Sequence, residues 1–257
     1  MTNLLSDPFR LEEDTALITG GGTGIGLGIA RCMVRAGARV VLAGRREEPL
    51  AVACGELGAK ASYVVHDITR LDAAEELVSA AQDAAQAPLT ILINNGGTHL
   101  KKFAVDTTPQ EFQRLLDTHV LGAYALTRAT VPGMVERGRG SILFISSMAA
   151  FMGMPQVVAY SAAKSAYFGI VATLSAELSC KGIRVNAIAP GWILSEMSER
   201  AFKNDPARKA RVMARIQMGR MGNPADIGHA AVYLCSPAAT YVTGVTLPID
   251  GGAAVAF

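Results

Sequence analysis

Seven short apolar runs recur along the chain, each separated from the next by a longer segment in which apolar residues return with helical spacing. A strand followed by a helix, repeated this often, predicts parallel strands with helices on both faces. The nearly continuous apolar character of the runs also fits strands buried on both sides. We therefore expect an α/β fold with a doubly wound parallel sheet, its strands at 15–19, 39–43, 61–65, 89–94, 141–146, 183–189 and 245–249.

A single domain over residues 1–257 is expected, because no linker, internal repeat or shift in composition divides the chain. The one long polar insertion, at roughly 195–222, predicts a helical flap over a binding site. Its charges fit a solvated surface helix equally well.

The charges and cysteines narrow the class of protein. With 24 basic and 22 acidic residues, the formal charge of +2 is too weak to indicate nucleic acid or a membrane surface as a partner, so a small molecule is the expected ligand. The four cysteines have neither metal-site nor disulfide spacing, which predicts no metal and a reducing, cytoplasmic location. No signal peptide is visible, and no apolar run approaches the ~18 residues that span a bilayer.

A glycine-rich run, TGGGTGIG at 19–26, falls between the first expected strand and the first expected helix. Glycine lets the backbone turn sharply and approach a ligand closely, and a helix N-terminus offers free N–H groups to a pyrophosphate. The run departs from the GxGxxG spacing at Ile29, and a plain tight turn is the alternative. Its position favours a dinucleotide, with contacts from Gly20, Gly22, Thr23, Gly24, Ile25 and Gly26.

The end of the second strand reads AGRREE, where dinucleotide folds often place an acid that binds the adenosine ribose. Gly44 stands at that position, and Arg45 and Arg46 follow it. Arginine can hold a 2′-phosphate that a carboxylate would repel, so NADP(H) is the preferred cofactor and NAD(H) the second candidate. Two solvated arginines at a helix start are the alternative.

Tyr160 and Lys164, in the run YSAAK, stand four residues apart and share one face of an expected helix. An ammonium about 4 Å from the phenol would be worth ~4 kcal/mol, enough to bring the pKa of Tyr160 from about 10 toward neutrality. Tyr160 would then exchange a proton with a carbonyl or alcohol oxygen that Ser147 also binds. The YxxxK spacing alone is often a chance pair. Ser147 and the glycine run favour an active site.

These motifs together resemble the short-chain dehydrogenase/reductase family over nearly the whole chain. The resemblance rests on TGGGTGIG, the HDIT run at 66–69, INNGG at 93–97, Ser147 with YSAAK, RVNAIAPGWILSEM at 184–197 and the late IDGG. It implies a seven-stranded Rossmann-like sheet, with Ser147, Tyr160 and Lys164 as the catalytic group. It also implies a homotetramer built on helices at about 109–137 and 157–180. Further cofactor contacts implied by the family are Tyr160, Lys164, Asp67, Ile68, Asn94, Gly96, Pro190, Gly191, Ile193 and Ser195.

Three positions depart from the family pattern. NNAG reads NNGG, Ser195 replaces a common Thr, and His119 stands where many members carry a catalytic Asn that holds a relay water. Either the imidazole of His119 joins the proton relay with a pKa near 6.5, or it is a structural residue and the relay runs through backbone and water. We favour the structural interpretation.

Two further groups are expected around the substrate. His99, Lys101 and Lys102 follow the fourth strand and could attract a carboxylate or phosphate on the substrate, although we favour a solvated loop. An apolar, adaptable pocket wall is expected from Met148, Phe151, Met152, Trp192 and Met197.

The sequence thus predicts an oxidoreductase that interconverts a ketone and a secondary alcohol with NADP(H). Gluconate 5-dehydrogenases and 3-oxoacyl carrier-protein reductases are the subfamilies it most resembles. The alternative is a catalytically silent protein that senses NADP(H).

Overall fold

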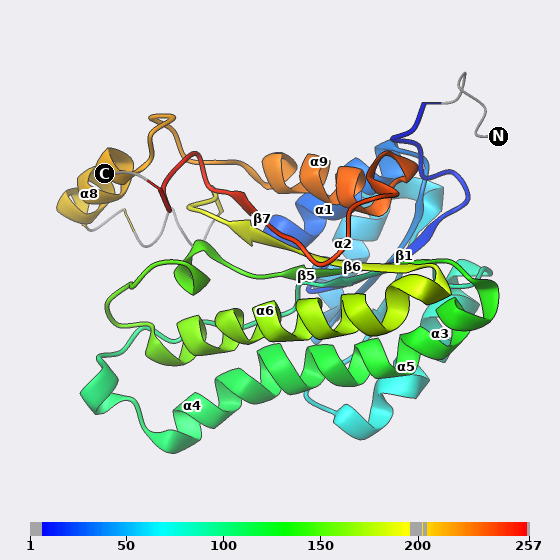
Figure 1. The fold of residues 1–257 in the computed structure, drawn as a ribbon, viewed down its shortest axis with the longest axis horizontal. Coiled ribbons are helices and arrows are strands. Elements are labelled where there is room, and N and C mark those ends of the chain that lie inside the picture. Colours follow the sequence, from blue (N-terminus) through cyan, green and yellow to red (C-terminus); the bar gives the residue numbers. More distant parts are fainter. Residues whose placement is uncertain (1–6, 196–201, 203–204, 256–257) are drawn as a thin grey trace.

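All seven predicted strands form and lie in one parallel sheet. Figure 1 shows the fold. The structure, a computed structural model, describes residues 7–195, 202 and 205–255. In the described part the strand order is β3-β2-β1-β4-β5-β6-β7. The strands are β1 Thr15–Thr19, β2 Arg39–Gly44, β3 Ala61–Val65, β4 Ile91–Asn94, β5 Gly140–Ile145, β6 Ile183–Pro190 and β7 Thr246–Ile249.

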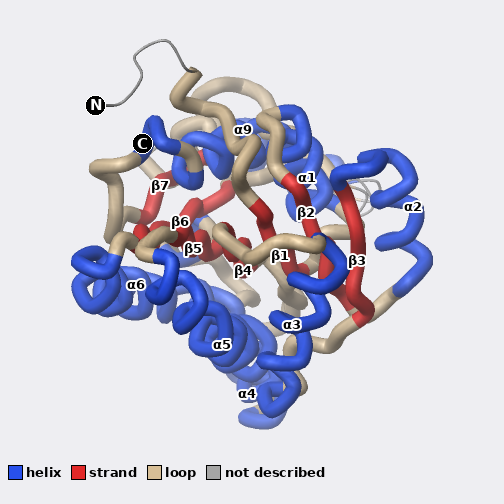
Figure 2. Tube along the Cα trace, turned by 90° about the vertical axis from the view of Figure 1, so that its right-hand side faces the viewer, coloured by secondary structure: helices blue, strands red, loops and turns tan. Residues whose placement is uncertain are grey.

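Helices cover both faces of the sheet, as Figure 2 shows. One face carries α1 Gly24–Arg35, α2 Glu47–Leu57 and α9 Pro224–Cys235; the other carries α3 Ala74–Ala85, α4 Pro109–Leu116, α5 Gly122–Arg137 and α6 Val158–Leu178. A π-helical turn, Asp117–Leu121, joins α4 to α5. Short 3-10 turns occupy Gly58–Lys60, Leu71–Ala73, Ala104–Asp106, Met148–Ala150, Ser179–Lys181 and Pro237–Ala239. Among the described helices, none has both the length and the apolar character needed to cross a membrane.

The strands are apolar because both faces of the sheet are buried. In β1, Ala16 and Ile18 pack into the cluster on the α1 and α9 side, whereas Leu17 between them packs into the cluster on the α5 and α6 side. Alternate residues of a strand point to opposite faces, so a strand covered on both sides needs apolar residues at every position. This burial explains why the strand positions were predictable.

The strand order fixes where a ligand can bind. The chain moves outward from β1 to β3 and then returns to β4 on the other side of β1. In such sheets ligands bind at the carboxyl ends of the strands, where the order reverses. The turns after β1, β4, β5 and β6 all meet at this edge, because the strands are parallel.

The polar insertion is helical in part. Helix α8, Pro206–Arg215, forms within it. Its Val212 and the following Ile216 pack with Met148 and Met221 in a third cluster. Residues 196–201 and 203–204 of the predicted flap lie outside the described residues. The role of a flap stays a prediction.

Helices α1 and α9 touch through glycine, which predicts a sharp steric penalty there. A Cβ on Gly28 would lie 2.7 Å from the carbonyl oxygen of Pro224, and one on Gly228 would lie 2.7 Å from the carbonyl oxygen of Gly28. Gly28→Ala should therefore lower the free energy of unfolding by ~1–3 kcal/mol, measured by urea denaturation. Gly55→Ala in α2, where the added Cβ meets open space, should raise it by up to about 1 kcal/mol. Equal effects of the two changes would contradict this packing.

Candidate active site

The glycine turn after β1 has the shape that a phosphate group requires. Gly20 and Gly24 have φ angles of +64° and +55°, a region that favours glycine. A Cβ on Gly26 would overlap the carbonyl oxygen of Gly20 and lie 2.7 Å from the side-chain nitrogen of Asn95. Helix α1 begins at Gly24, and the side chain of Thr23 does not cap it. The first amides of α1 are therefore left to bind an anion.

Two residues that the sequence reasoning did not single out hold this turn in place. The Thr19 hydroxyl accepts hydrogen bonds from the amides of Gly96 (2.7 Å) and Asn95 (3.0 Å). The Asn95 side chain donates to the carbonyl oxygens of Thr19 (2.8 Å) and Gly20 (3.3 Å). The end of β4 is thereby joined to the turn after β1. Thr19 belongs to the TGGGTGIG run and Asn95 to INNGG, but only the contacts in the structure distinguish these two residues from their neighbours in each motif.

The arginine pair predicted for the 2′-phosphate lies exposed at the start of α2. The side chain of Arg45 is 71% exposed, and its Nη1 lies 4.0 Å from Oδ2 of Asp67. Burial of Asp67 opposes ionisation, but the hydrogen bonds from Thr69 and the charge of Arg45 together hold the pKa of Asp67 below its usual value. Arg46 is also exposed. Both arginines are therefore accessible to a ligand from the solvent.

The predicted cofactor contacts at the ends of β3 and β4 differ in where they lie. A Cβ on Gly96 would lie 2.9 Å from Cδ1 of Ile68, so the segments after β3 and β4 meet. Asn94 instead points into the core, where its Nδ2 donates to the hydroxyl of Thr127 at 3.0 Å. Its Oδ1 finds no hydrogen-bond partner among the described residues. The side chain of Asn94 thus braces α5.

The candidates after β6 lie at the same edge of the sheet. Pro190 ends β6, and a Cβ on Gly191 would lie 2.6 Å from the Cα of Asp250. Ile193 forms an isolated bridge with Gly222. Ser195 is the last described residue before the gap at 196–201.

Ser147 and Tyr160 come together after β5. Ser147 precedes the 3-10 turn Met148–Ala150, and its hydroxyl oxygen accepts a hydrogen bond from the Ala149 amide at 3.1 Å. A hydrogen bond also joins the side chains of Ser147 and Tyr160. The predicted serine and tyrosine are therefore neighbours in space as well as in motif.

Lys164 is buried beneath them. Only 4% of Lys164 is exposed, and its Nζ donates a hydrogen bond of 2.6 Å to the carbonyl oxygen of Ile145. The Ser146 hydroxyl donates to the Lys164 carbonyl at 3.0 Å. These bonds fix the first turns of α6 to the end of β5. Burial lowers the pKa of Lys164 to about 7, because a desolvated ammonium is costly.

The predicted effect of Lys164 on Tyr160 is wrong for this protein. Burial raises the pKa of Tyr160, and the hydrogen bond with Ser147 lowers it by less. The Nζ atom lies 5.7 Å from the centre of the Tyr160 ring and is bonded to Ile145. Tyr160 is therefore a protonated phenol at neutral pH, suited to donate a proton.

His119 lies beside Tyr160, within the π-helical turn. The two rings are 5.5 Å apart and nearly perpendicular, and only 1% of His119 is exposed. Its Nε2 lies 2.7 Å from the Thr98 carbonyl oxygen, and its own carbonyl accepts from the Tyr167 hydroxyl. Burial and the charge of Lys164 lower the pKa of His119 to about 3. The imidazole is therefore neutral at neutral pH, which argues against the alternative in which His119 joins the relay with a pKa near 6.5.

The positive group after β4 is only partly available to an anion. Both carboxylate oxygens of Glu111 lie 3.0 Å from Nζ of Lys102, so that charge is already paired. Lys101 is exposed. The ring of His99 lies 4.9 Å from the ring of Tyr160. Of the three, His99 is the residue that reaches the reacting group.

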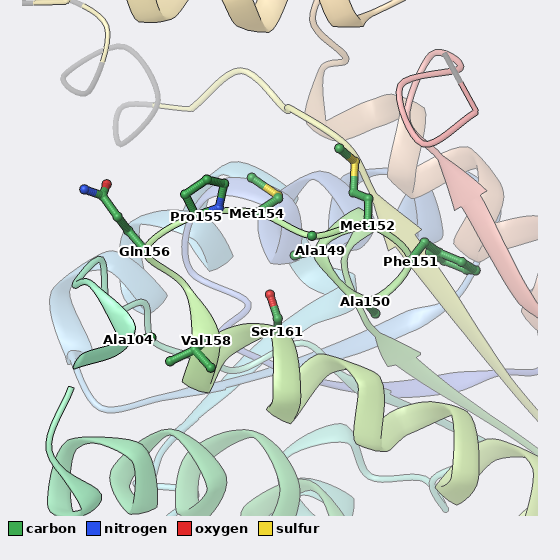
Figure 3. A pocket seen from close by; sticks show the side chains of 11 residues that line it. Ala104, Ala149, Ala150, Phe151, Met152, Met154, Pro155, Gln156, Val158 and Ser161 are labelled. Carbon is green, nitrogen blue, oxygen red and sulfur yellow. The ribbon is translucent and has the colours of Figure 1, made fainter. Parts of the chain in front are cut away.

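A cavity of about 490 Å³ lies next to these residues, under the loop that follows β5 (Figure 3). Phe151 and Met152 of the predicted pocket wall line it. Met148 and Trp192 belong to the adjoining third cluster, and Met197 lies outside the described residues. The full lining is Ala104, Ala149, Ala150, Phe151, Met152, Gly153, Met154, Pro155, Gln156, Val158 and Ser161. Within the described ranges, no group of three or more His, Cys, Asp or Glu side chains could hold a metal.

Comparison with known proteins places the chain in a family. A family model described as "Enoyl-(Acyl carrier protein) reductase" matches residues 20–254. Galactitol 2-dehydrogenase (L-tagatose-forming) from Cereibacter sphaeroides is 38% identical over 247 residues, covering 95% of this chain and 96% of that protein. The chain belongs to the short-chain dehydrogenase/reductase family of oxidoreductases, as the motifs predicted.

Further relatives agree in sequence and structure. The 2-dehydro-3-deoxy-D-gluconate 5-dehydrogenase of Bacillus subtilis is 36% identical over 251 residues, with 96% of this chain and 97% of that protein covered. A gluconate 5-dehydrogenase from Burkholderia cenocepacia, solved in complex with NADP and tartrate, superposes with a TM-score of 0.92 at 31% identity. That match covers 98% of this chain and 99% of the other.

The lowered pKa of Lys164 predicts a pH-dependent stability. Below about pH 7 the amine is protonated in both folded and unfolded chains; from about 7 to 10.5 the unfolded chain keeps a proton that the folded chain has released. The free energy of unfolding from this group therefore rises with pH across that window. Lys164→Met should remove the rise, as measured by urea unfolding at about pH 6 and about pH 9. The exposed Lys181→Met serves as control, and an unchanged slope in Lys164→Met would contradict the burial of a titrating amine.

Proposed function

We propose that this protein is an NADP(H)-dependent oxidoreductase that interconverts a ketone and a secondary alcohol. The observation that carries the proposal is the partly buried Tyr160, which is hydrogen-bonded to Ser147 and whose ring centre lies 5.7 Å from the buried amine of Lys164. This group lies at the carboxyl edge of the sheet, where the glycine turn after β1 also lies.

The residues at that edge fit a dinucleotide phosphate. The glycine turn offers backbone amides with no side chains in the way, and its closest approaches exclude even a Cβ at Gly26. The exposed Arg45 would bind the 2′-phosphate, with Arg46 beside it. NADP is present in the structure of the Burkholderia cenocepacia relative. When bound, the nicotinamide supplies or accepts the hydride.

The chain's own residues would manage the proton. Because its pKa is raised, Tyr160 holds its proton at neutral pH and would donate it to the substrate oxygen during reduction. The Ser147 hydroxyl would bind the same oxygen and orient it. Lys164, with a pKa of about 7, would return a proton to the phenol after turnover. His119 would hold the Thr98 peptide beside Tyr160 as a neutral donor, which favours its structural interpretation.

We also propose a cytoplasmic homotetramer. The four cysteines are free thiols, which suits a reducing compartment. Large apolar side chains are exposed on and beside helices α4 to α6, where a second copy would cover them. They are Phe103, Val105, Leu121 and Tyr124.

Steady-state oxidation of NADPH with a panel of ketones tests the activity. Wild-type protein should turn over at least one ketone, and Tyr160→Phe should lower kcat by about 100-fold or more while NADPH still binds, because only the donated proton is lost. Val52→Ala, an exposed change on α2 away from the phenol and from the proposed interface, is the control. NADPH binding with no turnover of any ketone would instead support the sensing protein that keeps the fold.

Substitution of Arg45 tests the cofactor preference. Arg45→Ala should weaken NADPH binding about tenfold or more and leave NADH within about twofold, because charge-assisted hydrogen bonds to the 2′-phosphate are lost. Fluorescence titration of both nucleotides measures this, with the exposed Arg128→Ala as a matched control. NADH binding as tightly as NADPH, with no response to Arg45→Ala, would refute the phosphate clamp.

A further inference from the structure

The cavity under the loop after β5 adjoins the reacting group. Ala149 and Ser161 line it, and each lies within two residues of Ser147 or Tyr160. Figure 3 shows the loop arching over the first turn of α6, with the Ser161 hydroxyl directed into the space between them. If the carbonyl oxygen of a substrate binds at Tyr160, the rest of that substrate lies next to this cavity.

The cavity is held open by contacts at both ends of the loop. The Lys102 amide donates to the Gln156 carbonyl at 2.8 Å. At the other end, the rings of Phe151 and Phe168 pack in a tilted arrangement with their centres 5.0 Å apart. Ligand sites are usually formed before the ligand arrives, and a loop fixed in this way meets that condition.

Its lining is nearly devoid of polar side chains. Of the eleven lining residues, only Gln156 and Ser161 carry one. The Ser161 hydroxyl is buried and finds no hydrogen-bond partner in the described part of the chain. A ligand with several hydroxyl groups would give up water at each of them and find at most these two side-chain partners.

Methionine extends the apolar wall behind the cavity. Met152 and Met154 pack against the third cluster, which also contains Met148, Met213, Met221 and Trp192. Thioether side chains are flexible and polarisable, so such a wall adapts to apolar groups of different shape.

On the basis of the function proposed above, we infer that this cavity receives the part of the substrate remote from the carbonyl, and that this part is an apolar alkyl or aryl group. The names of the sugar-alcohol and gluconate relatives describe polyhydroxylated substrates, which this lining does not satisfy. The Ser161 hydroxyl could form a hydrogen bond with a single polar atom on that otherwise apolar group.

The inference is tested by measuring kcat/KM for a homologous series of methyl ketones. Each added methylene that enters the cavity should raise kcat/KM about threefold to fourfold, from butan-2-one up to the length that fills it. A polyhydroxylated ketone of the same chain length should be at least about tenfold poorer than its alkyl counterpart.

Filling the cavity supplies a matched comparison. A Cβ on Gly153 would meet open space, so Gly153→Leu adds volume to the lining without straining the fold. It should abolish the gain in kcat/KM with chain length, because the added side chain takes up the space that the longer alkyl groups would enter. Gly55→Leu, also placed in open space but on α2, should leave the whole series unchanged. Ser161→Ala should preserve the preference for alkyl ketones, since the apolar walls produce it.

The outcomes separate this inference from the proposed function. Turnover of polyhydroxylated ketones at least as efficient as that of alkyl ketones, or a chain-length gain that survives Gly153→Leu, would overturn the inference and leave the oxidoreductase intact. If no ketone is turned over, the proposed function fails. Binding of an alkyl ketone in the cavity is then tested by the shift of the unfolding temperature that the ligand causes. Octan-2-one should raise the unfolding temperature of the wild type but not that of Gly153→Leu. Equal shifts in the two proteins would overturn the inference.

Discussion

The burial of one amine organises this site. Lys164 has no carboxylate among its described contacts, and its Nζ donates to the carbonyl at the end of β5. That bond, with the return bond from Ser146, sets the start of α6 against the strand that carries Ser147. Tyr160, one helical turn earlier, is thereby placed against the serine hydroxyl. The desolvation that lowers the pKa of the amine is the cost of this geometry.

The cofactor edge depends on a second set of buried polar contacts. Thr19 and Asn95 join the turn after β1 to the end of β4, the two strands between which the chain order reverses. A glycine-rich turn is flexible by itself, so fixed partners are needed to keep its amides aimed at one place. The glycines leave space for the ligand, and the hydrogen bonds of the Thr19 and Asn95 side chains hold the turn in one conformation.

Much of the fold followed from the chain alone. The strands were predictable because a sheet buried on both faces demands continuous apolar runs, as Leu17 between Ala16 and Ile18 illustrates. The spacing of Tyr160 and Lys164 correctly placed both in one helix. It did not reveal that Nζ turns to a backbone carbonyl, and so the predicted direction of the Tyr160 pKa shift was wrong.

Other features of the site depend on contacts between distant segments. The pairing of Lys102 with Glu111 and the neutral state of His119 arise from packing partners that no local pattern encodes. The most direct measurement of the state of Tyr160 is a pH titration of tyrosinate ultraviolet absorbance in wild type and Tyr160→Phe. In the free protein, Tyr160 should ionise only above pH 10, the ordinary pKa of tyrosine. Below that pH, the wild type and Tyr160→Phe should therefore show the same tyrosinate absorbance. One extra tyrosinate titrating near neutral pH in the wild type alone would contradict a protonated Tyr160 beside an amine bound to the strand.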